Sequence, residues 1–452
     1  MAATFSKNGV RTMNAIRDNM PSAFQAAVPV LDGSPEALSA FYGTMLENVN
    51  FRNAFVNLIN LIGIQYVQSR TYETRFTPFN RGFMPNGASV EEIAVDIAGV
   101  VRYNINEDFE KTHEYNPPDV KSALHFLDYQ VRYPFTISYD MLRMASRSYD
   151  GVETLVQGIF TSVINSANYD IDQACKYRIA YGLLHGQIPT VDISAMLPAS
   201  PTKDNYENIV AGGREYSNNF EIFSPDYTAA GNYSVSGKDR QYYIVSTAFE
   251  AQMGVKVIAQ AFNRDEVDYM GRRVLIDGFG KLDTQRLNTL FADVPGYEEI
   301  GSSDLEALNK VPLAVVDRDF LMMWDYVNEF ANNYSNSGLG YNYNYHVWKV
   351  IGLSPFVNQV AFDGNAQTIN TVTVTPATAS LAVGGTLQLT ATVDSTGFPS
   401  HKVTWKSDNA NVTVDSNGFV KVNAGASGTA NITATSVANA GKTGKCAITI
   451  SG

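Results

Sequence analysis

The pattern closest to a ligand-binding motif in this sequence is Gly441-Lys442-Thr443, which matches the last three residues of a phosphate-binding loop. Such a loop also needs a glycine at position 436 and a helix after the threonine, because backbone N–H groups of the loop and the helix bind the phosphates. Position 436 is Ser436, and a β pattern beginning at Cys446 follows. We therefore interpret the segment as a hairpin turn without a nucleotide.

Other residues that could carry chemistry also lack the necessary spacing. The five histidines form no i,i+4 pair and have no cysteine cluster beside them, so a zinc site has no support: His113, His125, His185, His346 and His401. Glu91 and Glu92 are adjacent in a predicted strand and point to opposite faces, so they cannot share an acid–base site. No Gly-x-Ser-x-Gly nucleophile motif occurs. We expect no enzyme activity, metal or cofactor.

The charge balance argues against a protein that binds nucleic acid through its phosphates. Lys and Arg total 33 against 45 Asp and Glu, a formal net charge of −12. Tyr341, Tyr343 and Tyr345 on one strand face could stack on bases or sugars, but this charge favours packing in a core or between subunits. No apolar run is long enough to span a membrane, and the first residues do not predict a secretory signal. Cys175 and Cys446 lie far apart, which indicates reduced thiols.

The composition changes after Asp363. The last 89 residues contain no Tyr, Arg or Glu, and short alternating β patterns are separated by turn residues. This pattern predicts an independent all-β sandwich over residues 364–452, with Trp405 and Phe419 in its core. We expect it to fold alone, after a short polar linker, and to lie outside any assembly that the first 363 residues form.

The motifs of this tail resemble a known family. They are Val374-Thr-Pro376, Leu381–Val393, Val403-Thr-Trp405, Asn417-Gly418 and Gly428–Ala434, in that order. The tail is similar to group 2 bacterial immunoglobulin-like (Big_2) domains, which occur on bacterial surface proteins and on phage virions. This resemblance alone leaves both settings open.

The first 363 residues mix helical and strand patterns. Residues 1–62 contain helical spacing around 34–62 and predict an N-terminal arm. Residues 64–110 predict an extended hairpin loop, in which strands at 70–76 and 90–97 flank a tip rich in glycine and proline.

A strand at 129–137 and a long helix at 150–184 belong to a peripheral region at 111–200. The helix follows an Asp150/Glu153 capping pattern, is about 50 Å long at 1.5 Å per residue, and would serve as a spine with Leu155, Ile159 and Val163 in its core-facing stripe. Residues 198–241 indicate an irregular insertion.

Residues 242–363 predict an α/β axial lobe with return strands. The elements expected there are a helix at 255–262 and strands at 274–276, 314–316 and 341–348. The whole chain is thus predicted to be α+β, followed by the all-β tail.

An N-terminal arm, an extended hairpin, a spine helix and an axial lobe, in that order, resemble the Hong Kong 97 (HK97) phage capsid fold. Several segments are similar to major capsid proteins of phi29-type short-tailed phages: 88–93, 258–263, 275–279, 314–320, 343–349 and 356–362. Residues 198–241 and the first 30 residues carry no such similarity.

The resemblance implies a structural protein that assembles as hexamers and pentamers into an icosahedral or prolate shell, in the host cytoplasm, around double-stranded DNA held without sequence specificity. It further implies a scaffolding protein and a portal as partners, and no membrane. No protease-removed scaffolding segment is expected before the hairpin. The hairpin residues expected to contact a neighbouring subunit are Tyr72, Phe76, Phe79, Phe83, Glu91 and Glu92.

Two other classes of protein are considered. The first is a bacterial surface or adhesion protein, which the absence of a recognisable signal disfavours. The second is an enzyme, which the absence of a catalytic constellation disfavours.

Overall fold

The computed structural model describes residues 7–47, 51, 73–84, 87, 89–100, 118–138, 151–198, 200–256, 272–335 and 340–451. The chain divides into two compact units. The first comprises residues 1–77, 129–172 and 325–349, and the second comprises 78–128, 173–324 and 350–452.

The described part of the first unit starts with three helices, which belong to the segment expected to form the N-terminal arm. They are α1 (Lys7–Asp18), α2 (Ser22–Ala27) and α3 (Pro35–Glu47). Phe24 and Phe41 lie at the centre of their packing, with ring centroids 5.1 Å apart in an edge-to-face arrangement. The same apolar cluster includes Phe160 and Tyr343, so these helices share a core with later parts of the unit.

That shared core forms on β4 (Tyr129–Ser138) and β10 (Gly340–Leu353), which are antiparallel with Tyr343 opposite Phe135. The Phe135 and Tyr343 rings stack at 5.0 Å. Both strands belong to a sheet of order β1-β9-β10-β4, with β1 (Asn80–Phe83) and β9 (Leu321–Ser335). The predicted strands at 129–137 and 341–348 are confirmed.

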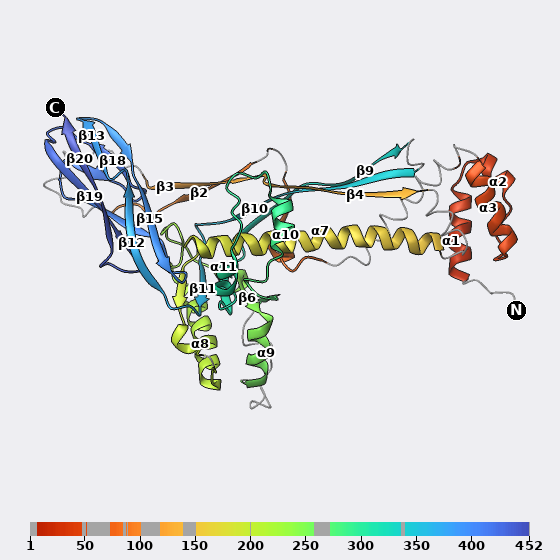
Figure 1. The fold of residues 1–452 in the computed structure, drawn as a ribbon, viewed down its shortest axis with the longest axis horizontal. Helices are drawn as coiled ribbons and strands as arrows, with labels where there is room; N and C mark the ends of the chain where they lie inside the picture. The colour runs from red at the N-terminus through yellow and green to blue at the C-terminus, as the bar shows by residue number, and fades with distance from the viewer. Residues whose placement is uncertain are drawn as a thin grey trace. The chain divides into compact units, whose positions relative to one another are not determined.

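Helix α7 (Gly151–Leu184) confirms the predicted spine as one continuous helix of 34 residues (Figure 1). It contains no proline, so no backbone hydrogen bond is lost along its length. It ends in a Schellman motif: Gly186 has φ +61°, its N–H bonds to Leu183 O at 3.1 Å, and the Gln187 N–H bonds to Gly182 O at 2.8 Å. Ile159 packs against the apolar core and Val163 is half-buried, whereas Asp150 and the Leu155 side chain lie outside the described residues.

The second unit contains a five-stranded sheet of order β5-β11-β8-β6-β7. Its strands are β5 (Thr190–Asp192), β6 (Gln241–Ser246), β7 (Arg272–Ile276), β8 (Leu313–Asp317) and β11 (Gln359–Asp363). We call this sheet and the helices of the second unit that follow β5 the axial lobe; residues 325–349, which the prediction included in the lobe, belong to the first unit. Strands β6, β8 and β11 are buried along their whole length, as expected for strands covered on both faces. The predicted strands at 274–276 and 314–316 are confirmed.

The second unit also contains helices, and one of them contradicts a prediction. They are α8 (Lys203–Asn219), α9 (Thr247–Lys256), α10 (Thr284–Leu290) and α11 (Ser302–Leu308), with short 3₁₀ turns η2 (Ser194–Met196) and η3 (Lys238–Arg240). The segment 198–241, expected to be irregular, contains the 17-residue helix α8, capped by the Thr202 and Asn205 side chains in a capping box. Within the predicted helix at 255–262, residues 257–262 lie outside the described part.

The hairpin differs from the prediction in its strand partners. The described part of 70–76 contains no strand and leads into the 3₁₀ turn η1 (Thr77–Phe79) and β1. The strand β2 (Ser89–Val95) pairs antiparallel with β3 (Val120–Phe126), a strand that the sequence reading missed. We call this β2–β3 pair the ribbon.

The tail is an all-β sandwich with its own apolar core. Its sheets have the orders β12-β15, β13-β20-β19-β16 and β14-β18-β17. The strands are β12 (Thr368–Thr375), β13 (Thr378–Ala382), β14 (Thr386–Gln388), β15 (Thr390–Thr396), β16 (Val403–Ser407), β17 (Val412–Val414), β18 (Phe419–Val422), β19 (Gly428–Ser436) and β20 (Thr443–Ser451).

Of the two aromatic residues predicted in the tail core, one packs against the core and the other is exposed. Trp405 is partly buried and packs against the core, as expected. Phe419 is 43% exposed, so its assignment to the core is wrong; the next residue, Val420, points inward because neighbouring side chains on a strand alternate. Both cysteines are free and buried. None of the helices in the described ranges is long and apolar enough to cross a membrane.

Breaking α7 should destabilise the protein. Replacing Ile159 with proline removes a helix hydrogen bond and should lower the free energy of unfolding by about 3 kcal/mol or more. The neighbouring Gly158→Ala is the matched control: its new Cβ meets nothing within 4 Å, so this variant should be about 0.5–1 kcal/mol more stable. Urea unfolding of the two variants measures both effects. Equal unfolding midpoints would contradict the spine role.

A second pair of variants tests the packing of the tail. Gly418 has φ +80°, and a Cβ there would lie 2.7 Å from Leu389 O and 2.9 Å from the Trp405 ring. Gly428 has φ +77° with nothing within 4 Å of the same position. Gly418→Ala should therefore lower the thermal midpoint of the tail clearly more than Gly428→Ala, since backbone strain is matched and only the first meets Leu389 O and the Trp405 ring. Equal losses would show that the close packing of Leu389 and Trp405 around Gly418 does not stabilise the tail.

Candidate contact surface

The two faces of the ribbon carry side chains of opposite character. In the β2–β3 register Glu91 lies opposite Leu124 and Val95 opposite Val120, so these residues share one face. Glu92, Ala94, Lys121 and His125 belong to the other face because side chains alternate along each strand. We call these the outward and the inward face.

The outward face is apolar and exposed. Its large apolar side chains are between 50% and 62% exposed: Ile93, Val95, Val120, Leu124 and Phe126. A two-stranded ribbon is marginally stable by itself in water, and an exposed apolar patch of this kind marks an interaction surface. The arrangement therefore favours burial of this face against another chain.

The inward face carries polar side chains, beside Val90, Ala94 and Ala123, and contacts other parts of the second unit. Glu92 lies at its centre: one carboxylate oxygen accepts a hydrogen bond from Ser354 Oγ at 2.7 Å, and the other lies 3.2 Å from His125 Nε2. His125 is buried and sits directly over Gly352, where any Cβ would clash with the imidazole ring. Lys121 donates to Ala230 O at 3.1 Å and lies 3.7 Å from an Asp96 carboxylate oxygen. The ribbon is thus held by polar contacts, the reverse of an ordinary half-buried sheet.

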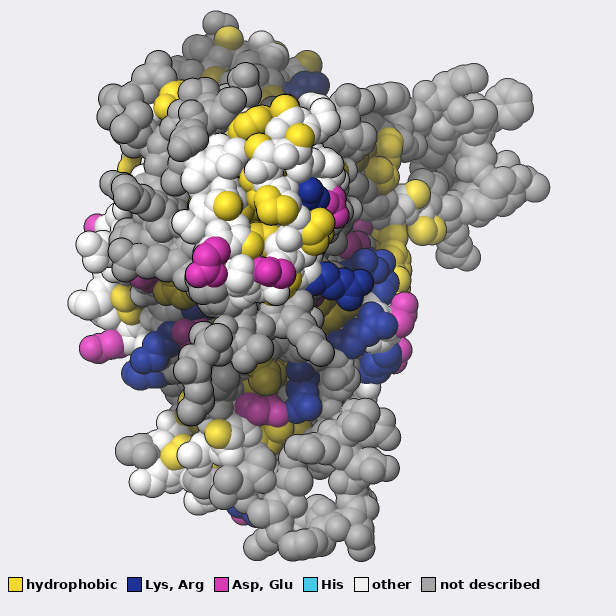
Figure 2. Space-filling view, turned by 90° about the vertical axis from the view of Figure 1, so that its right-hand side faces the viewer, with side chains coloured by type: hydrophobic (Ala, Val, Ile, Leu, Met, Phe, Trp, Pro, Cys, Tyr) yellow, Lys and Arg dark blue, Asp and Glu magenta, His cyan; other side chains and the backbone are white. Residues whose placement is uncertain are grey.

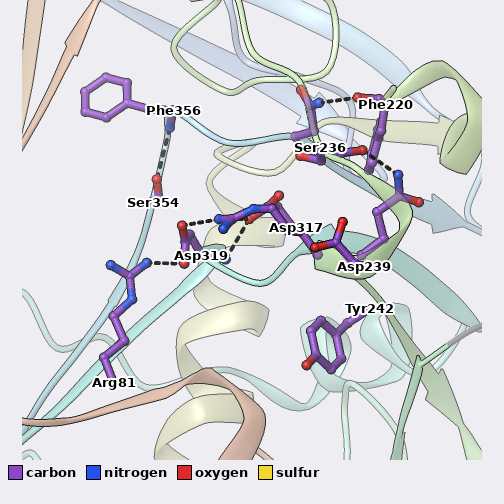
Figure 3. Close-up of polar contacts among 12 residues, drawn as sticks. Arg81, Phe220, Ser236, Asp239, Tyr242, Asp317, Asp319, Ser354 and Phe356 are labelled. Carbon is purple, nitrogen blue, oxygen red and sulfur yellow. Dashed lines mark hydrogen bonds and ion pairs between the residues drawn. The ribbon is translucent and has the colours of Figure 1, made fainter. Parts of the chain in front are cut away.

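Charged residues also anchor the strand that precedes the ribbon (Figure 3). Arg81 on β1 forms an ion pair with Asp319 at 2.6 Å, and Arg240 bridges Asp319 and Asp317. The Asp317 carboxylate is buried, at 2% exposure, so its contact with Arg240 offsets the cost of burying its charge. The Arg81 guanidinium also lies over the Trp324 ring at 4.9 Å. This network fixes β1 on the axial lobe.

The predicted contact residues have different positions in the structure. Phe76 and Phe79 are each 1% exposed and pack inside their own chain, so the prediction that they contact another subunit is wrong. Phe83 is 64% exposed, and Glu91 is on the outward face. Glu92 belongs to the inward face, and Tyr72 lies outside the described residues.

Sequence reasoning missed most of the outward face. A signal for it existed, because Val120, Ser122, Leu124 and Phe126 occupy alternate positions, with Lys121 and His125 between them. The apolar positions of β2, Ile93 and Val95, alternate in the same way.

Other candidate chemistry is not assembled by the fold. Tyr341, Tyr343 and Tyr345 are buried, so their rings are not available to stack on bases or sugars. In the part of the chain that the structure describes, no three His, Cys, Asp or Glu side chains group closely enough to hold a metal ion. Figure 2 shows basic and acidic side chains beside each other on one face, so the net negative charge is not spread evenly over that surface.

Comparison with known protein families shows which family the chain belongs to. A model of the phi29-like phage major capsid protein family matches residues 13–363, and a group 2 bacterial Ig-like domain matches residues 368–446. The chain belongs to the phi29-like phage major capsid protein family. The function expected from the sequence, a phage major capsid protein, is therefore confirmed, as is the immunoglobulin-like tail.

Individual relatives of the chain are also major capsid proteins. The major capsid protein of Bacillus phage PZA is 28% identical over 398 residues, which covers 87% of this chain and 82% of that protein. The major capsid protein of Bacillus phage B103 is 27% identical and covers 91% of this chain and 86% of its own length. These are structural virion proteins, so the place of this capsid protein is the virion shell.

A solved structure supports the fold. A chain in a structure of the head fiber and inner core protein of native bacteriophage P68 matches with a TM-score of 0.50 at 12% identity, covering 65% of this chain and 86% of that one. The HK97-like capsid fold predicted from the order of the elements is thus confirmed.

The inward contacts of the ribbon can be tested with adjacent residues. Glu92→Ala removes the acceptor for Ser354 and the partner of His125, which should weaken ribbon docking by about 1–3 kcal/mol. Glu91→Ala, on the outward face, should change stability by less than about 0.5 kcal/mol. Hydrogen exchange of the 89–95 and 120–126 amides in unassembled protein measures the difference. Equal exchange in both variants would exclude Glu92 as the anchor.

Proposed function

We propose that this capsid protein assembles by packing the outward face of the ribbon against a neighbouring subunit. The observation that carries the proposal is the reversed polarity of the ribbon, with Glu92 and Lys121 bound to the chain and Leu124 and Phe126 exposed. Such a surface has no use in an isolated chain, where it would promote aggregation.

The energies involved suit a reversible assembly. Full burial of a large apolar side chain contributes about 1.5–3 kcal/mol, and the outward side chains are about half exposed, so each would contribute about 1 kcal/mol on contact. Five such residues give a contact of several kcal/mol before the cost of association is subtracted. Weak contacts of this size allow wrongly placed subunits to dissociate, and closure of a symmetric shell multiplies the number of contacts.

The other partners follow from the family rather than from a site on this chain. We infer assembly in the host cytoplasm into hexamers and pentamers, with a scaffolding protein and a portal, around double-stranded DNA. With a net charge of −12, DNA would be held weakly and without sequence specificity, which suits packaging and ejection.

The tail is proposed to lie on the outside of the shell. Its strands present many exposed threonines and few charges, for example Thr371, Thr373 and Thr375 along β12. Protease or antibody access to the tail in intact shells tests this location. Access only after the shell is opened would overturn it.

The ribbon proposal is tested by placing a charge on its outward face. Leu124→Asp should leave a folded, soluble subunit and abolish shell formation, because a carboxylate would be buried without a partner in the contact. Sedimentation and negative-stain microscopy of protein expressed with its scaffold would measure assembly, and circular dichroism would confirm the fold.

The matched control is Val437→Asp, an equally drastic change at a tail residue that is 51% exposed. This variant should form normal shells. Shells from Leu124→Asp in normal yield would overturn the proposed contact, whereas failure of both variants would show that any new surface charge blocks assembly.

A further inference from the structure

The tail is joined to the axial lobe through a buried carboxylate. Asp363, at the end of β11, is 0% exposed. One of its oxygens accepts the Phe398 N–H of the tail at 2.8 Å and the Gln367 side-chain N–H at 3.1 Å, and the other accepts the Asn365 N–H at 2.9 Å. Thr190 of β5 adds a second bond to the same tail residue by donating its hydroxyl to Phe398 O. A buried, multiply bonded carboxylate of this kind fixes geometry, which a flexible tether would not need.

A second contact lies at the C-terminal end of the spine helix. Gly186 ends α7 and approaches the tail so closely that a Cβ there would lie 2.5 Å from the His401 ring and 2.7 Å from the His401 backbone nitrogen. His401 is held in place by Ser395 Oγ, 3.0 Å from its Nε2. Only glycine allows this approach, because it combines a positive φ with the absence of a side chain.

A third contact connects the tail to the ribbon through the loop 220–237. A Cβ at Gly231 would lie 2.2 Å from the Lys402 ammonium nitrogen, so this side chain of the tail approaches the loop closely. Lys121 of β3 donates to the adjacent Ala230 O. The Tyr233 N–H in the same loop bonds to Asp96, just beyond β2, at 3.4 Å. The base of this loop is fixed on the lobe, where Asn232 donates to Phe356 O at 2.9 Å. One loop therefore lies between the tail and the base of the ribbon.

We propose that the tail is a clamp that docks on its own core at Gly186, Thr190 and Asp363 and, through Lys402, holds the loop 220–237 against the base of the ribbon. The partner of this docking surface is the tail of the same chain. The connection between the lobe and the tail is short, because only residues 364–367 separate the buried end of β11 from β12. This favours docking of the chain's own tail over docking of a neighbour's tail. Removal of the docking contacts should loosen the ribbon without unfolding either part.

Docking is tested at Gly186, where a side chain would collide with the tail. Gly186→Ala places a Cβ 2.5 Å from the His401 ring and 2.7 Å from the His401 backbone nitrogen, so it should push the tail away from the end of α7. We expect faster hydrogen exchange of the 398–402 amides in the unassembled subunit. The control, Gly82→Ala, shares the positive φ but has nothing within 4 Å of the new Cβ, and should exchange like the parent protein. Equal exchange in the two variants would overturn docking, and exchange of the parent protein that depends on its concentration would assign the docked tail to a neighbour.

The coupling between the tail and the ribbon is tested by changing Thr190, because such a change leaves Gly186 and its turn unaltered. Thr190→Val removes the donor to Phe398 O, a loss of about 1 kcal/mol, which should speed hydrogen exchange of the 230–233 and 93–97 amides roughly five-fold. Thr190→Ser retains the hydroxyl and should exchange like the parent protein. Faster exchange confined to the tail in Thr190→Val would overturn the coupling to the ribbon, even if Gly186→Ala shows docking.

Discussion

The reversed polarity of the ribbon is the constraint on which the rest of the account depends. A two-stranded ribbon has one face for its own chain and one face for the surroundings, and here the polar face is turned to the chain. Polar contacts such as Glu92–Ser354 and Lys121–Ala230 give a definite orientation, because hydrogen bonds need specific distances and angles. The apolar face is exposed in the subunit, and we propose that a neighbouring subunit covers it. A capsid subunit needs both properties, a fixed direction and an incomplete surface.

The sequence predicted the architecture well where local periodicity decides the structure. The spine helix, the strands at 129–137 and 341–348 and the alternating tail follow from spacing alone, and the structure bears them out. Pairing between distant strands was harder to predict. The sequence pattern predicts a partner at 70–76 for the strand at 90–97, because hairpins usually join neighbouring strands, whereas the actual partner is β3 (Val120–Phe126). The composition of 198–241, rich in polar residues and glycine, concealed helix α8, whose capping box and packing against the lobe outweigh a modest helix propensity.

The contact residues were predicted less well for a related reason. Aromatic residues in a projecting hairpin need to be buried, which predicts that Phe76 and Phe79 contact another subunit, yet both are buried in their own chain. Periodicity shows which residues share a face, but it does not show which face is turned to the chain. At the ribbon the usual rule, apolar inward, gives the wrong answer, and only the partners of Glu92 and Lys121 reveal it. Exceptions of this kind are expected at sites where function, and not the stability of one chain, sets the residue types.

The central claim is that assembly buries the outward face of the ribbon, and thiol accessibility in Leu124→Cys measures this most directly. The Leu124 side chain is about half exposed in the subunit, and both native cysteines are buried, so the introduced thiol would be the one that reacts. Reaction with a maleimide should be fast in unassembled subunits and at least about ten-fold slower in completed shells, while Val437→Cys on the tail should react equally in both states. Equal reactivity of Leu124→Cys before and after assembly would contradict the account.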